Sequence, residues 1–299
     1  MMRSPSLLLG AVLAALATPA AAQQVNRGFP LDRDAAFRIL NLAGSITVRG
    51  WDRDSVAITG NVPAGEGVFY AGGRGGGAKM GVEPRGATPP RAELHVMVPR
   101  NARVWIKTDE ATVDVAGVAG QVDVYSVGGR VQVAGPVRTL SVETMDGVVT
   151  VEGEMTWVRL KSAGGAVRFL GSADDLVASS VSGAVAVDAR RLGRARIETV
   201  TGNVRLAAAP ERSGTISVET HAGLAEILLP PGAAAIFELS TLGGTITNRL
   251  TSAKPGPGPG GRGQASSFGT DVSGALVTVR TFKGDIIVGR AEGLAAGTK

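Results

Sequence analysis

The chain has 299 residues, with 43 glycines, no cysteine and only 4% aromatic residues. The absence of cysteine excludes disulfide scaffolds, thiol catalysis and cysteine metal sites. The formal charge is +5, and the basic residues are scattered without interleaved aromatic residues, which argues against nucleic-acid binding. The apolar residues are mainly Val, Ala, Leu and Ile; β-branched side chains favour strands, so many short strands joined by tight turns are expected.

The first 22 residues have the pattern of a cleaved signal peptide. Arg3 supplies a positive charge, residues 7–17 form an apolar run, and the alanines at 20–22 form a cleavage site before Gln23. The run is too short to span a bilayer, and no cysteine follows the cleavage site to carry a lipid. We therefore predict a signal peptide over residues 1–22 and export to the periplasm or the cell surface; a buried N-terminal helix is the alternative.

A repeated pattern covers nearly all of the remaining chain. Each copy reads apolar-x-apolar-x-(Ser/Thr)-x-x-Gly-x-apolar-x-apolar, as in residues 140–151 and 158–169. The template glycines are Gly44, Gly129, Gly147, Gly165, Gly183, Gly202, Gly223, Gly244 and Gly284, with Ala111 in one copy. The hydroxyl residues three positions earlier are Thr108, Ser126, Thr144, Ser162, Ser180, Thr199, Thr220, Thr241 and Thr281, with Asn41 in the first copy. Because the spacing is regular, the copies are expected to form one repeated structural unit.

Each copy contains two short strands with apolar residues on alternate positions. One copy cannot bury its own apolar face, but a stack can, because each copy covers the next. We therefore predict an all-β fold over residues 23–290, a single-chain parallel β-solenoid (β-helix) with two strands in each rung of about 18–21 residues. The glycines are predicted to be turn residues with positive φ, and the stacked hydroxyls to bond to one another or to turn backbone.

Two Gly- and Pro-rich segments interrupt the pattern, near residues 62–91 and near residues 252–270. Copies lie on both sides of each segment, so we interpret both as flexible loop insertions; linkers between two domains are the alternative. The irregular first copy and the last copy, residues 277–288, are expected to cap the two ends. Residues 291–299 are predicted to form a flexible tail.

Several parts of the chain resemble one family. They are the Thr-x-x-Gly-x-Val-x-Val copies, the Val-Pro turn at 98–99, the Leu-Pro-Pro-Gly turn at 229–232 and the closing segment 279–288. Together they resemble the bacterial putative-adhesin family, an exported β-strand-repeat domain. The resemblance implies a solenoid of short strands in an exported or envelope protein, and it brings no catalytic residues.

One pair of carboxylates falls on adjacent rungs of the predicted stack, Glu198 and Glu219. Stacked carboxylates can bind calcium or share acid and base roles on a polysaccharide. Arg196 and Arg205 lie nearby and can neutralise them, so we interpret the pair as a solvated face and only a weak metal candidate. With two histidines in the chain and no triad or zinc pattern, no catalytic, cofactor or metal site is predicted.

The sequence therefore predicts a non-enzymatic exported protein, an adhesin or a cell-envelope structural or binding protein. Its partner is expected to be an envelope, matrix or surface protein or polysaccharide, and not a nucleic acid. The chain after residue 22 has no apolar segment long enough for a transmembrane helix. Two alternatives stay open: a polysaccharide-active enzyme that uses Glu198 and Glu219, and an envelope scaffold that self-associates end to end.

Overall fold

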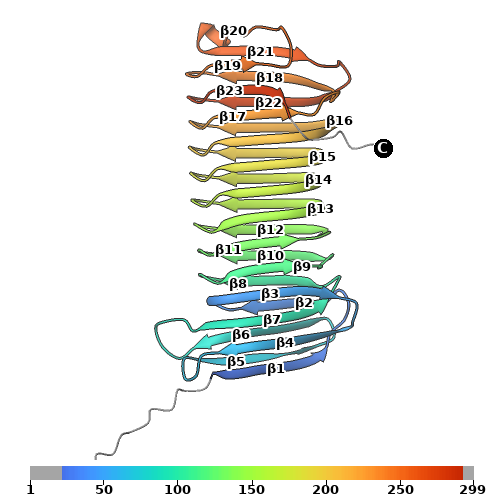
Figure 1. Ribbon diagram of the computed structural model, residues 1–299, viewed down its shortest axis with the longest axis vertical. Helices are drawn as coiled ribbons and strands as arrows, with labels where there is room; N and C mark the ends of the chain where they lie inside the picture. The colour runs from blue at the N-terminus through green and yellow to red at the C-terminus, as the bar shows by residue number, and fades with distance from the viewer. Residues whose placement is uncertain (1–21, 292–299) are drawn as a thin grey trace, which may run out of the picture.

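The computed structural model describes residues 22–291, and over these residues the protein is all-β, with a single three-residue 3-10 turn and no α-helix. The strands are hydrogen-bonded into one large, mostly parallel sheet and are stacked along the long axis of the molecule (Figure 1). No membrane-spanning helix occurs in this part of the chain. The predicted signal peptide and tail lie outside the described residues, apart from Ala22 and Ala291.

The strands are named in chain order. The first seven are β1 (Gln23–Pro30), β2 (Ala36–Leu40), β3 (Ala43–Trp51), β4 (Ser55–Val62), β5 (Gly67–Arg74), β6 (Gly77–Pro84) and β7 (Arg91–Pro99). The middle ones are β8 (Arg103–Thr108), β9 (Thr112–Ala116), β10 (Gln121–Ser126), β11 (Arg130–Ala134), β12 (Thr139–Thr144), β13 (Val148–Ser162), β14 (Val167–Ser180), β15 (Val185–Thr199) and β16 (Val204–Thr220). The last are β17 (Ala225–Leu229), β18 (Ala235–Thr241), β19 (Ile246–Asn248), β20 (Gly256–Pro257), η1 (Pro259–Gly261), β21 (Gln264–Gly269), β22 (Ala275–Thr281) and β23 (Ile286–Arg290).

In the middle of the molecule, equivalent residues of successive copies pair in parallel. Val122 of β10 pairs with Val104 of β8 on one side and with Leu140 of β12 on the other. The strands that follow the turn form a second ladder in the same way, β9 with β11 and β11 with β13. We call one strand of each ladder, with the turn between them, a rung.

The stack has two edges. At the glycine-turn edge, on the left in Figure 1, each chain segment turns from the first ladder to the second within one rung. At the return edge, on the opposite side, the chain passes to the next rung. From β13 to β16 it does so within continuous strands of 14–17 residues, whose first and second halves belong to different ladders.

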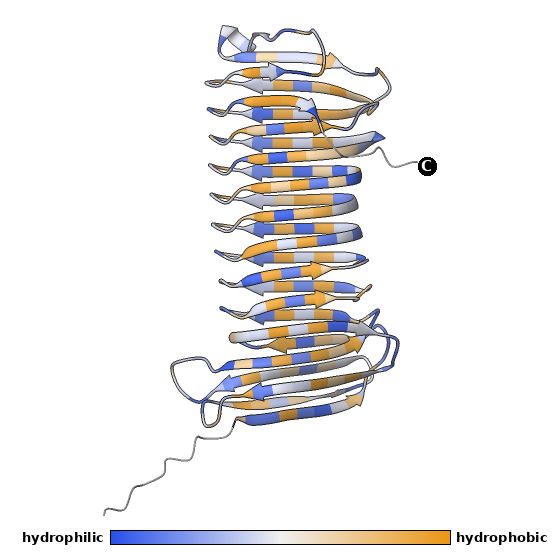
Figure 2. Cartoon of the chain, in the orientation of Figure 1, coloured by the Kyte–Doolittle hydropathy of each residue, from blue (hydrophilic) through white to orange (hydrophobic). Residues whose placement is uncertain are grey.

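The core lies between the two ladders and is built from alternate residues of their strands. Burial follows the period-2 pattern, as in β11, where Val131 and Val133 are buried while their neighbours are exposed. The alternation of apolar and polar residues is visible along the strands in Figure 2. The largest fully buried side chains are Phe37, Phe169 and Phe237. Because each rung covers the next, one continuous apolar cluster runs from Val25 to Val288.

The rungs do not follow chain order at either end. β22 lies between β16 and β18, and β23 lies between β17 and β19. The prediction that the last copy caps the stack is therefore wrong. The same apolar template fits any place in the stack, and an internal place buries Val277 and Val279 beneath rungs on both sides. At the other end, β2 and β3 lie between the β6–β7 and β8–β9 rungs, so the first copy is not the cap either.

Antiparallel strands cover both ends. β1 pairs with β4, β4 with β7 and β5 with β6 at the N-terminal end, while β21 pairs with β18 and β20 at the other. The segments predicted as flexible loops thus contain β5, β6, β20 and β21, which corrects that interpretation. Their many glycines hid short strands, and buried residues such as Met80 and Val82 hold β6 against the core.

Candidate functional site

The predicted hydroxyl residues form a column next to the glycine-turn edge, and all nine are buried. In most rungs the hydroxyl oxygen accepts a hydrogen bond from the backbone N–H three residues later, as from Gly147 to Thr144 at 2.9 Å and from Gly165 to Ser162 at 2.9 Å. The hydroxyls of Thr199 and Thr220 are 2.9 Å apart, and those of Thr241 and Thr281 are 2.8 Å apart. These groups satisfy one another and the turn backbone, so the column stabilises the turn and is not free for a ligand.

The template glycines form a second column beside the hydroxyls, for a reason that differs from the prediction. Only Gly44 and Gly129 among them have positive φ. At most of the others the rungs approach too closely for a side chain: a Cβ on Gly165 would lie 2.0 Å from the carbonyl oxygen of Gly147. The rung of β22 and β23, which is inserted after that of β16 and β17, makes the same close contact. A Cβ on Gly284 would lie 1.9 Å from the carbonyl oxygen of Gly223. Glycine is required at these positions for stacking, and not for turn conformation.

Glu198 and Glu219 are register partners on β15 and β16. Arg196 donates a hydrogen bond to Glu198 at 2.6 Å, and this bond raises the pKa of Arg196 above its usual value, with further support from the charges of Glu198 and Glu219. Arg205, the other expected neutralising residue, instead pairs with Asp188 at 2.7 Å and with Glu226 at 3.5 Å in the second ladder. Glu198 is therefore paired, while the described contacts of Glu219 include only the hydroxyl of Ser217, at 3.5 Å.

The inserted copy changes the surroundings of this pair. Arg280 of β22 is the register partner of Glu219, a place that chain order would give to Ser240. His221 and Phe282 stack with ring centroids 4.8 Å apart and planes 12° apart. A shallow hollow is lined by Glu198, Thr199, Glu219, Thr220, His221, Arg280, Thr281 and Phe282. The sequence could not predict this hollow, because the template does not specify which copy follows β16 in space.

The chemistry of this hollow is that of a polar surface with an aromatic rim. Among residues 22–291, no three His, Asp or Glu side chains gather around a common point that could hold a metal ion. Two carboxylates, one guanidinium and a stacked ring pair are groups that can hydrogen-bond and stack on a sugar. The described residues place no third acidic or histidine ligand beside Glu198 and Glu219, so the structure adds no support to a calcium site there.

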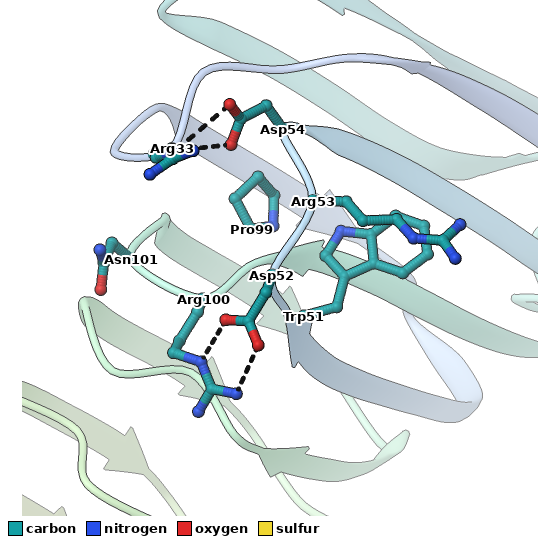
Figure 3. Close-up of a pocket in the computed structure, with 8 residues that line it drawn as sticks. All are labelled: Arg33, Trp51, Asp52, Arg53, Asp54, Pro99, Arg100 and Asn101. Carbon is teal, nitrogen blue, oxygen red and sulfur yellow. Dashed lines mark hydrogen bonds and ion pairs between the residues drawn. The ribbon is translucent and has the colours of Figure 1, made fainter.

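A second hollow lies at the N-terminal end of the stack (Figure 3). Arg100 donates hydrogen bonds to Asp52 at 2.8 and 3.3 Å, and Arg33 donates to Asp54 at 2.9 and 3.2 Å. The guanidinium of Arg53 lies over the ring of Trp51, 5.0 Å from its centroid. The hydrogen bond and charge of Arg100 hold the pKa of Asp52 below its usual value.

These pairs tie three separate loops together. Arg33 follows β1, Asp52 and Asp54 follow β3, and Arg100 follows β7, and they meet because β3 pairs with β7. Sequence analysis missed this cluster, since its members are far apart in the chain and belong to the irregular end. Each carboxylate already has a guanidinium partner, so the cluster stabilises loop positions and is exposed enough that each pair contributes little.

Comparison with solved structures finds chains that are similar to this one only at a low level. One is a putative cell adhesion protein from Clostridium sporogenes, 8% identical over 90% of this chain and 100% of its own, with a TM-score of 0.25. Another is a putative lipid binding protein from Parabacteroides distasonis, 12% identical over 89% of this chain and 96% of its own, with a TM-score of 0.36. At such TM-scores the likeness carries no argument about function. No family model and no curated protein matches the sequence, so the family resemblance stays a prediction.

Proposed function

We propose that the protein is an exported, non-enzymatic β-solenoid of the cell envelope that acts by contact with a surface, matrix or envelope partner. In this proposal residues 23–290 form one domain between the signal peptide and a short tail. The observation that best supports a structural role is the use of the repeat: the hydroxyl column satisfies turn backbone, and the glycine column allows close stacking. The repeated residues are accounted for by the stack itself, which leaves the outward faces for binding.

The charge distribution supports a protein or polysaccharide partner over a nucleic acid. Arg191 bridges Asp174 and Glu211 at 2.7 Å each, and Arg194 pairs with Asp175 at 3.0 Å. Such pairs neutralise the basic residues locally, whereas a nucleic-acid surface needs a stripe of unpaired positive charge.

Export is tested by fractionation together with the mass of the purified protein. A chain that begins at Gln23 and is found in the periplasm, or is removed by protease from intact cells, is the expected result. Protease sensitivity of intact cells would favour adhesion or matrix binding, and protection until the outer membrane is opened would favour an envelope scaffold. A full-length chain that starts at Met1 and stays in the cytoplasm would overturn the proposal.

A polysaccharide-active enzyme is the second candidate. The pairing of Glu198 with Glu219 beside Arg280 and the His221–Phe282 stack is the observation that favours it. New reducing ends released from a polysaccharide panel, and lost in Glu219→Gln, would establish this activity. Glu143→Gln is the matched control, because Glu143 lies in the same column with Tyr125 and Lys161 as its register partners. Absence of cleavage by the wild-type protein would remove this candidate.

A further inference from the structure

The turns of the glycine-turn edge expose apolar side chains at one position. The residue directly after the hydroxyl is exposed in rung after rung, and six of these residues are large and apolar with 43–57% of their surface accessible. In stacking order the position holds Asp109, Val127, Met145, Ala163, Val181, Val200, His221, Phe282 and Leu242. We call the stretch from Val127 to Leu242 the apolar ridge. Figure 2 shows apolar colour recurring at these left-hand turns.

The fold does not require this ridge. Tight turns favour Gly, Asn, Asp and Ser for conformational reasons, and exposed Val, Met and Phe have no such reason to be there. The buried hydroxyl and the template glycine already make the turn. An exposed row of apolar side chains on a soluble surface generally marks a contact site.

Backbone hydrogen bonds hold the ridge in a straight line. Met145 N–H donates to the carbonyl of Val127 at 3.2 Å, Val181 N–H to that of Ala163 at 3.1 Å, and Val200 N–H to that of Val181 at 3.2 Å. Successive ridge residues are therefore one rung apart, and the eight turns from Asp109 to Phe282 extend over roughly 34 Å at the usual strand spacing. The ridge is a rigid, linear feature.

Charge is distributed unevenly along this line. The four central turns, residues 163–166, 181–184, 200–203 and 221–224, contain no Asp, Glu, Lys or Arg. The first turn carries Asp109 and Glu110, whereas the turn of the inserted rung carries Lys283 next to Phe282. The two turns that follow the first one carry Arg130 and Asp146. Asp285, near Lys283, accepts hydrogen bonds from Thr245. The line thus has an acidic end, an uncharged middle and a lysine near the other end.

We propose that the apolar ridge docks against the same ridge of a second copy of this chain, side by side and antiparallel. A two-fold axis between Ala163 and Val181 places Asp109 and Glu110 of one copy opposite Lys283 of the other. A parallel arrangement would place the two acidic ends together, which costs free energy. The interface is of the isologous kind that closes as a dimer.

Two observations indicate how strong the interface is and which class of partner it fits. A ridge one turn wide buries less than the roughly 800 Å² per partner of a stable interface, so the dimer is weak and concentration-dependent. The outward column beside the ridge carries Glu143, Glu198 and Glu219 together with Lys107, Lys161 and Arg280, so it is charge-balanced and offers no basic cluster to attract an anionic lipid surface. A second copy presents the same balanced charges beside its own ridge, so it fits as the partner.

Sedimentation velocity over a concentration series tests the proposal with the purified protein. The wild type is expected to show a monomer–dimer equilibrium, and Val181→Lys is expected to weaken it at least about tenfold, because the lysines of the two copies then lie only one rung apart across the axis. Leu170→Lys is the matched control, since Leu170 is 41% exposed but lies at the return edge. It is expected to leave the dissociation constant unchanged, and thermal unfolding checks that both variants are folded.

Charge reversal tests the antiparallel register. Lys283→Glu is expected to weaken the dimer, and adding Asp109→Lys and Glu110→Lys to it is expected to restore the affinity. A wild-type monomer at every concentration, or equal weakening by Val181→Lys and Leu170→Lys, would overturn the proposal. So would binding of the monomer to phosphatidylcholine–phosphatidylglycerol vesicles that Val181→Lys abolishes, because the ridge would then be a membrane contact.

Discussion

The chain turns at both edges of the stack, but the two edges bury and expose opposite kinds of residue. At the return edge each rung buries an apolar residue, namely Val118, Val137, Met155, Ala173 and Leu192 in turn, and shows charged residues such as Arg191 and Glu211 to solvent. At the glycine-turn edge each rung from β8 to β18 buries a hydroxyl residue and, over much of this length, the edge exposes an apolar one. Both edges satisfy the fold, but only the return edge has the surface expected of a solvated turn.

The edges also differ in how much variation they accept. The hydroxyl position (Asn41 in the first copy) and the glycine position (Ala111 in one copy) are three residues apart in every copy, because the residue at the glycine position contacts the rung beneath it. The return edge absorbs the change from 18-residue to longer copies, with register shifts near Gly171 and between Ala189 and Arg194. The glycine-turn edge is therefore the rigid reference of the stack, and the return edge is where it adapts.

The largest effect is expected from a side chain placed in the glycine column. Gly165→Ala puts a Cβ 2.0 Å from the carbonyl oxygen of Gly147, so the rungs must separate, and we expect a loss of about 3 kcal/mol or more in the free energy of unfolding. Gly128→Ala is the control at the same edge, because its Cβ would lie 3.8 Å from the carbonyl oxygen of Asp109, the nearest atom beyond its neighbours in the chain. Urea unfolding measures both, and equal stabilities would show that close stacking does not explain the column.

A smaller loss is expected from the hydroxyl column. Thr144→Val keeps the shape of the side chain but removes the acceptor for the N–H of Gly147, leaving a buried donor unpaired at a cost of about 1–3 kcal/mol. Thr144→Ser keeps the acceptor and is expected to lose less than Thr144→Val does. Should the serine variant prove the less stable of the two in urea unfolding, packing of the methyl group and not the hydrogen bond would explain the column.

The repeat predicts the all-β class, the parallel pairing and the pairing of Glu198 with Glu219, because each follows from local period and spacing. It does not predict the order of rungs at the ends. The apolar slots of β22 match those of β18, so their places are decided by how residues 249–274 return and by the antiparallel cover of β21. Arg280 reaches Glu219 only through that choice, and the hollow beside His221 follows from it.

The apolar ridge was present in the repeat but was not recognised in it. The template leaves the position after the hydroxyl undefined. Val127, Met145 and Val200 are therefore not identified when the template is used to find core positions. Only the structure shows that these side chains are exposed and stacked on consecutive turns. A position that is apolar in many copies and has no role in packing is the signal that could have identified it.

Insertions sharpen the contrast between the edges. Two residues, Gly-Ser, added after Arg212 at the return edge are expected to cost about 1 kcal/mol or less, because this edge already accommodates copies of different length. The same insertion after Ser182 separates Ser180 from the N–H of Gly183 and is expected to cost clearly more. Thermal unfolding of the two variants measures the difference. Equal costs would show that the edges do not differ in rigidity.

The smallest effect is expected on the outward strand face, beside the glycine-turn edge. Lys161 points outward on β13, and its register partner Glu143 lies 3.8 Å from Arg159 instead. Lys161→Ala therefore removes no ion pair and is expected to change the free energy of unfolding by less than about 0.5 kcal/mol. A loss as large as that of Gly165→Ala, four residues further on, would mean that Lys161 is buried and that the strand register is wrong. A near-zero change would confine the sensitive positions to the glycine and hydroxyl columns and the alternating core.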